Sequence, residues 1–136
     1  MPADIQTILS NPNYYAVKIN GNTGITFGLT ATSVFQDYGC TAGGAQLIGA
    51  YWSIPTGKTI TLKWGSAGAT AMHLNDSGNL SNEMIAGGIS DPTAVPTGNM
   101  SVILPTALAA NTFYSLILEF GRGPNGQATT TPTDIT

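Results

Sequence analysis

Residues 104–120 read LPTALAANTFYSLILEF, and their second half, 112–120, decides the fold class. As a strand, 112–120 would have two largely apolar faces, one carrying Tyr114, Leu116, Leu118 and Phe120 and the other Phe113, Ser115, Ile117 and Glu119. Such a strand belongs in the middle of a sheet or under a partner. The preceding LPTALAAN has the Leu-Pro, short helical turn and tyrosine order with which β-sandwiches cross between sheets, where a tyrosine hydroxyl fixes the crossover. This stretch therefore predicts a β-sandwich.

Six further runs of apolar or alternating residues lie between short turns rich in Gly and Pro. They are YYAVKI (14–19), ITFGLT (25–30), AQLIGAYWSI (45–54), TITLKW (59–64), ATAMHL (69–74) and MSVIL (100–104). Alternation in TITLKW directs three residues to the core: Ile60, Leu62 and Trp64. The turns NGNTG (20–24) and PTGK (55–58) predict hairpins between the runs on either side of each. We therefore predict an all-β domain over 14–121, an antiparallel β-sandwich or jelly roll of about seven to eight strands.

The two ends of the chain depart from the strand pattern. Asp4 is a favoured N-cap residue, and the apolar residues after it have helical i, i+3, i+4 spacing: Ile5, Ile8 and Leu9. We therefore predict an N-terminal arm over residues 1–13 that contains a short helix. Residues 122–136 are rich in Thr, Pro and Gly and have too few apolar side chains to fold alone. We predict that they form an extended tail that lies against a neighbouring subunit or protein.

Charged residues make up only 8% of the 136 residues, and the net charge is −3, whereas soluble domains carry about 25% charged residues. A surface with so little charge repels its neighbours weakly, so it suits packing against copies of itself, a larger assembly or neutral sugars. The few Lys and Arg residues are scattered, which excludes nucleic acid as a partner. We expect no membrane span and no secretory signal, because the longest apolar runs are short. The single cysteine, Cys40, fits synthesis in a reducing cytoplasm.

No motif in the chain predicts catalysis. The only histidine, His73, lies in AMHLNDSGN (71–79), where no nucleophile elbow accompanies it and the exposed face of a strand explains it. GKT (57–59) resembles the end of a phosphate-binding loop, but the earlier glycine and the following helix are missing. A loop that starts at Asp76 lacks the glycine and glutamate of an EF-hand, which leaves only an irregular calcium site open. We therefore predict a protein that is not an enzyme and has no cofactor, no catalytic residue and no metal ligand.

Aromatic side chains supply the alternative basis for binding, because their faces stack on sugars. The candidates are Tyr14, Tyr15, Tyr51, Trp52, Trp64 and Tyr114. Adjacent residues of a strand point to opposite faces, so only one of Tyr51 and Trp52 can face the core. The other is expected to be exposed or at an interface, and a surface glycan therefore stays open as a partner.

The chain resembles the small capsid-decoration (cement) proteins of tailed bacteriophages in overall type, through DIQTILSNPNYYAVKI (4–19), WSIPTGKTITLKW (52–64) and TFYSLILEF (112–120). The resemblance implies a non-enzymatic jelly-roll protein that is made in the host cytoplasm, forms homo-oligomers on the capsid exterior and bridges subunits of the major capsid protein. The partner-binding residues that we predict are Ile5, Ile8, Leu9, Tyr51, Trp52, Ala128, Thr129, Thr130, Thr131, Pro132, Thr133, Asp134, Ile135 and Thr136. Two alternatives remain, a carbohydrate- or receptor-binding β-sandwich and a structural subunit of a tail or tube.

Overall fold

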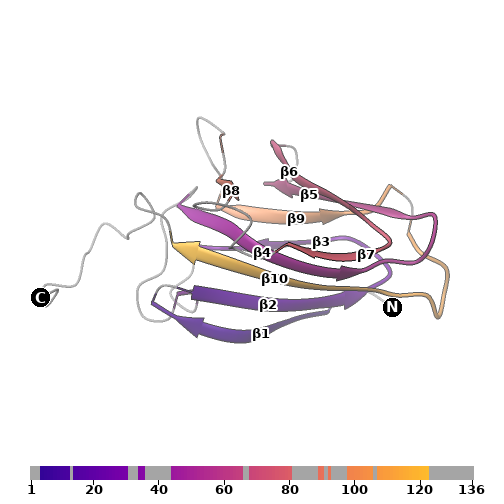
Figure 1. Cartoon of the computed structure of the whole chain (residues 1–136), viewed down its shortest axis with the longest axis horizontal. Helices are drawn as coiled ribbons and strands as arrows, with labels where there is room; N and C mark the ends of the chain where they lie inside the picture. The colour runs from indigo at the N-terminus through magenta and orange to yellow at the C-terminus, as the bar shows by residue number, and fades with distance from the viewer. Residues whose placement is uncertain are drawn as a thin grey trace, which may run out of the picture.

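The computed structural model of the chain describes residues 4–12, 14–30, 34–35, 44–65, 68–80, 89–90, 92, 98–105 and 107–122. Over these residues the chain forms ten β-strands and no helix, so the predicted all-β class is confirmed. The strands make two antiparallel sheets that face each other across one hydrophobic core (Figure 1). None of the described residues belongs to a helix long and apolar enough to cross a membrane.

The first sheet has six strands and the second has four. In spatial order, the first contains β1 (Asp4–Asn11), β2 (Tyr14–Gly21), β10 (Tyr114–Arg122), β4 (Ala45–Ser53) and β7 (Ser77–Leu80), with β8 (Ile89–Ser90) also paired to β4. The second contains β3 (Ile25–Gly28), β9 (Asn99–Ile103), β5 (Thr59–Trp64) and β6 (Thr70–Asn75). Most spatial neighbours are distant in sequence, so the chain crosses repeatedly from one sheet to the other.

Strand β10 lies in the middle of the first sheet, as its two apolar faces predict. It pairs antiparallel with β2 on one side and with β4 on the other. The residues of its core face are all fully buried: Tyr114, Leu116, Leu118 and Phe120. On its outer face, Ser115, Ile117 and Glu119 are only half-buried. The outer face of this sheet is therefore the side on which polar and apolar groups both meet solvent.

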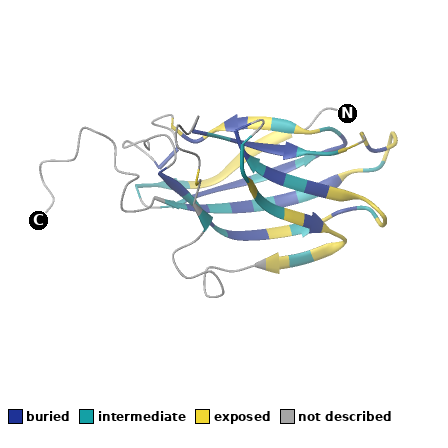
Figure 2. Ribbon diagram, turned by 90° about the horizontal axis from the view of Figure 1, so that it is seen from above, coloured by how far each residue is buried: buried dark blue, intermediate teal, exposed yellow. Residues whose placement is uncertain are grey.

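Aromatic rings join the two sheets inside the core. Phe120 of β10 packs edge-on against Phe27 of β3, with ring centroids 6.2 Å apart, and lies 6.4 Å from the ring of Tyr15 on β2. The ring of Phe35 lies 6.2 Å from that of Tyr15. The second sheet contributes the alternate residues of β5, as predicted: Ile60, Leu62 and Trp64. Figure 2 shows how buried positions alternate with less buried ones along the strands.

Both predicted hairpins are wrong. NGNTG leads from β2 in the first sheet to β3 in the second, and PTGK leads from β4 to β5 across the same gap. A glycine turn reverses the chain, but which edge the next strand joins depends on the burial of its faces. A hairpin does form between β5 and β6. After β6 the chain changes sheets at Asp76, whose φ of 55° is in the left-handed region, and continues as β7.

The predicted N-terminal helix is also wrong, because residues 4–11 form strand β1. This strand pairs antiparallel with β2 along its length. An isolated helix of one or two turns is unstable in water, whereas the edge of β2 offers backbone partners to the whole segment. A bulge between Thr7 and Leu9 inserts Ile8 as an extra residue. The bulge breaks the period-two pattern, and the resulting spacing of apolar residues looks helical.

The crossover from β9 to β10 has the tyrosine anchor that the sequence predicts. The Tyr114 hydroxyl donates a hydrogen bond to the Thr23 carbonyl oxygen at 2.7 Å. The Leu108 amide donates to the Asn22 carbonyl oxygen at 2.8 Å. Both bonds reach the segment that leads from β2 to β3, which itself changes sheets. Two separate crossovers are therefore tied to each other.

This anchor predicts a specific alkaline sensitivity. Burial raises the pKa of Tyr114 from 10.0 to about 12, so between these values the unfolded chain loses a proton that the folded chain keeps. The stability due to this group is complete below pH 10 and is lost as the pH rises toward 12, by about 2–3 kcal/mol in all. We expect Tyr114→Phe to cost about 1–2 kcal/mol at pH 7 through the lost hydrogen bond. The free energy of unfolding, measured with urea at pH 7 and at pH 11, should fall less between the two pH values in Tyr114→Phe than in the wild type. An equal fall in the two proteins would contradict the prediction.

Candidate functional site

The predicted partner-binding residues fall in three places. Ile5, Ile8 and Leu9 lie in β1, and Tyr51 and Trp52 lie in β4. The third group, residues 128–136, lies outside the described residues, so its role stays a prediction. β1 and β4 belong to the same sheet, where β2 and β10 lie between them.

Strand β1 presents three aliphatic side chains to solvent. Ile5 is 39% exposed, Ile8 52% and Leu9 47%. Over the ranges that the structure describes, β1 is also the last strand of the first sheet, so its far side is an open strand edge (Figure 1). Proteins usually protect such edges with charges or prolines, because an open edge with exposed aliphatic residues pairs readily with another chain. β1 therefore has the features of a strand that a partner covers.

Strand β4 separates Tyr51 and Trp52 as the alternation predicts. Trp52 packs against the core, and its indole N–H donates to the Asn75 carbonyl oxygen at 3.0 Å. Its ring lies directly on Gly78 of β7, where an added Cβ would come within 2.7 Å of the ring. Tyr51 points to the outer face and is 41% exposed. Trp52 is thus held in place by packing and by its hydrogen bond, and Tyr51 is the more exposed of the two rings.

The outer face of the first sheet holds a tyrosine–carboxylate pair that the sequence did not assign. The Tyr14 hydroxyl on β2 donates to Oε2 of Glu119 on β10 at 2.5 Å. Burial, with this hydrogen bond, raises the pKa of Tyr14 above its ordinary value, so the hydroxyl keeps its proton. Glu119 is in register with Ala16 on one side and Gly49 on the other. These two residues are small, so no bulky side chain flanks the carboxylate in its own row.

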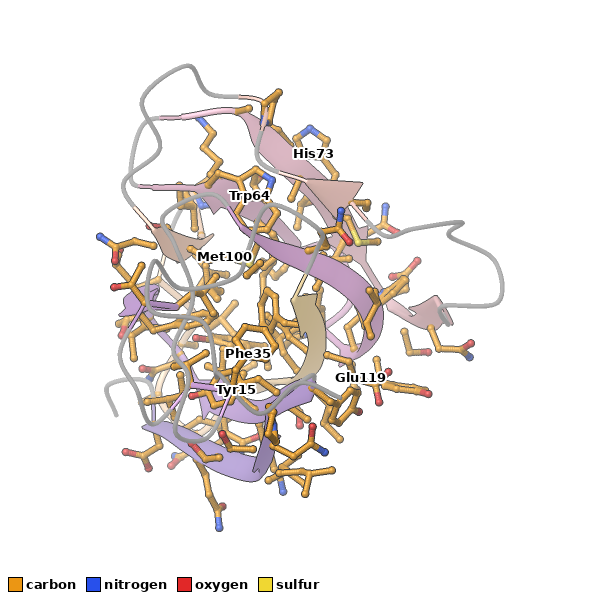
Figure 3. All side chains as sticks on the ribbon, turned by 90° about the vertical axis from the view of Figure 1, so that its left-hand side faces the viewer. Tyr15, Phe35, Trp64, His73, Met100 and Glu119 are labelled. Carbon is orange, nitrogen blue, oxygen red and sulfur yellow. The ribbon has the colours of Figure 1, made fainter. Side chains whose placement is uncertain are left out.

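Tyr51 belongs to the same surface as this pair. Ile117, two residues before Glu119 on β10, is in register with Lys18 on β2 and with Tyr51 on β4. Beside Tyr51 a hollow of about 220 Å³ opens, and its lining also includes Trp52, Ser53, Gly78, Ser115 and Ile117. Figure 3 shows Glu119 on the outer side of β10, away from the core residues Tyr15 and Phe35. We call this surface the outer-face patch: Tyr14, Lys18, Tyr51, Ser53, Ser115, Ile117 and Glu119.

The other residues considered for sugar stacking, catalysis or metal binding do not form a further site among the described residues. Three of the possible sugar-stacking rings are buried and cannot meet a ligand: Tyr15, Trp64 and Tyr114. His73 is exposed on β6 in the second sheet, where its Nδ1 lies 3.2 Å from the Thr61 hydroxyl. In the part of the chain that the structure describes, no group of three or more His, Cys, Asp and Glu side chains could hold a metal ion. Cys40 and Glu83 lie outside that part.

Comparisons with known proteins leave the family open. No family model matches the chain, and no curated protein matches it significantly. The solved structures include a similar chain, an uncharacterized conserved protein with a double-stranded β-helix domain from Klebsiella pneumoniae. That similarity covers 96% of this chain and 85% of the other, at 10% sequence identity and a TM-score of 0.39. A likeness this low says nothing about activity.

Proposed function

We propose that this protein is a non-enzymatic structural protein with a jelly-roll fold, which decorates the outside of a phage capsid and bridges neighbouring major capsid subunits. The observation that carries the proposal is β1, where Ile5, Ile8 and Leu9 are exposed beside an open strand edge. Full burial of such a side chain contributes about 1.5–3 kcal/mol. A strand of the partner could add backbone hydrogen bonds along the same edge. β1 would thus supply both affinity and orientation.

The surface composition supports attachment to an assembly. With only 8% charged residues, the chain loses little charge solvation when a large part of its surface is covered. A capsid presents many equivalent sites, and copies that also contact one another gain from multivalency, so a modest affinity for each site is enough. The resemblance to decoration proteins favours a capsid over other assemblies. Localisation on the virion exterior, after synthesis in the host cytoplasm, belongs to the same proposal.

We expect Ile8→Lys to weaken attachment by about tenfold or more without unfolding the protein. Ile8 is 52% exposed at the bulge, so lysine fits the free protein but places a charge in the interface. The measurement uses capsids of the phage that encodes the chain, purified without this protein, and counts bound copies after sedimentation. Thr59→Lys is the matched control, because Thr59 is exposed on the second sheet and receives the same charge.

The outcomes separate the parts of the proposal. Wild-type binding by Ile8→Lys, or an equal loss in Thr59→Lys, would remove β1 from the interface. Wild-type protein that sediments with purified tails and not with capsids would make it a tail subunit instead.

A further inference from the structure

The outer-face patch contains an aromatic ring that is partly open to solvent. Tyr51 is 41% exposed, and Ile117 is its register partner on β10. A tyrosine ring has an apolar face and a hydroxyl at its tip, so it can pack on C–H groups while its hydroxyl forms hydrogen bonds. The ring and the aliphatic residue together form a small apolar platform.

A positioned acceptor lies one strand away from this ring. Glu119 is in register with Gly49, which precedes Tyr51 by two residues on the same face of β4. The bond from Tyr14 to Oε2 holds the carboxylate in place. An ionised carboxylate has about four acceptor sites, so it can accept from further donors while it keeps Tyr14. The carboxylate is therefore oriented before any ligand arrives.

Donors lie on the other sides of the platform. Ile117 is in register with Lys18 on one side and with Tyr51 on the other. Neighbouring strands are about 4.8 Å apart, so the backbones at Lys18 and Tyr51 are about 10 Å from each other. Ser53 and Ser115, which each carry a hydroxyl, help to line the hollow beside Tyr51. Its volume of about 220 Å³ is below the roughly 300–1,000 Å³ of sites for drug-sized ligands. The hollow suits one ring of a longer molecule.

We infer that the outer-face patch binds a pyranose ring of a neutral polysaccharide, which stacks on Tyr51 and donates hydroxyl hydrogen bonds to Glu119. A pyranose has a C–H face for the ring and hydroxyls around its edge for the carboxylate, the serines and Lys18. A phosphate or sulfate would meet Glu119, a like charge, with Lys18 as the one cation of the patch. A wholly apolar ligand would desolvate both charged groups without partners. The inference is independent of the capsid proposal, because the patch does not include the edge of β1.

The test is a titration of the isotopically labelled protein, followed by amide NMR, with the methyl pyranosides of glucose, galactose, mannose and N-acetylglucosamine. We expect saturable shifts in β4 and β10 with at least one of them. Tyr51→Ala should lower that affinity by about tenfold, and Tyr51→Phe should lower it less because the stacking face remains. Glu119→Gln keeps an acceptor for Tyr14 but removes the charge, and it should also weaken binding. His73→Ala, which removes an exposed ring from the second sheet, should leave the affinity unchanged.

Three results would overturn the inference. The first is the absence of saturable shifts with all four pyranosides while the spectrum is that of the folded protein. The second is an affinity that Tyr51→Ala leaves intact. The third is a set of shifts confined to the second sheet. Binding that depends on Tyr51 and Glu119 but not on His73 supports it.

Discussion

Phe120→Ala is expected to lower the free energy of unfolding by about 3–5 kcal/mol, a large part of the roughly 5–15 kcal/mol available to a domain. Phe120 is fully buried in the central strand of the first sheet. Its ring contacts Phe27 of the second sheet and Tyr15 of its own, at centroid distances of 6.2 Å and 6.4 Å. Alanine would therefore leave a cavity between the sheets and remove two aromatic contacts. Urea unfolding followed by tryptophan fluorescence measures the loss.

Two further variants keep this prediction testable even if Phe120→Ala does not fold. Phe120→Leu fills most of the volume and should cost less than Phe120→Ala. Phe113→Ala removes the same side chain from a position that is 46% exposed, and it should change stability by about 0.5 kcal/mol or less. A loss in Phe113→Ala as large as that in Phe120→Leu would mean that the core is not centred on Phe120.

The positions of seven of the ten described strands, all except β1, β7 and β8, were predictable because alternation is a local property. TITLKW has the buried set that the sequence predicts, and the two apolar faces of β10 correctly place it inside a sheet. Strand pairing was not predictable, because nothing in NGNTG or PTGK specifies which edge the next strand joins. β7 was missed for a related reason: its residues, SGNL, carry turn chemistry, and their pairing with β4 makes them a strand.

The candidate site likewise has one part that the sequence predicts and one part that it does not. Alternation along β4 predicts that one of Tyr51 and Trp52 points away from the core, and in the structure this residue is Tyr51. The pair of Tyr14 and Glu119 could not be predicted, because the two residues are 105 positions apart and meet only through the register of β2 and β10. Alternation puts each on one face of its own strand, but the sequence does not show that these strands are neighbours.

The β1 edge and the outer-face patch are compatible with simultaneous use. A strand added beside β1 would extend the sheet within its own plane and leave its outer face open. Leu9 is in register with Ala16, which is in register with Glu119, so β2 separates the two surfaces. A protein attached through β1 could therefore still present Tyr51 and Glu119 to solvent.

Gly24→Ala is expected to cost about 2–3 kcal/mol although it adds a single methyl group. Gly24 lies just before β3, and a Cβ there would collide with the carbonyl oxygen of Val102 on β9. This atom belongs to the backbone of a paired strand, so it cannot rotate away. Gly28→Ala, at the far end of β3, is the matched control, because the nearest contact of its added Cβ would be Asn99 Oδ1 at 3.5 Å, an ordinary distance. Equal losses in the two variants would show that the close approach of Gly24 to β9 is not what the fold requires.

A double variant tests whether this close approach and the tyrosine anchor hold the same crossover. The Tyr114 hydroxyl binds the carbonyl of Thr23, the residue next to Gly24. If Gly24→Ala displaces the chain at this point, the hydrogen bond is already weakened, and adding Tyr114→Phe should cost less than it does alone. The sum of the two single-variant losses in unfolding free energy would then exceed the loss in the double variant. For residues in such contact, we expect this difference to be about 0.5 kcal/mol or more. Strictly additive losses would mean that the crossover is fixed at two independent points, so the anchor would act on the β9–β10 connection alone.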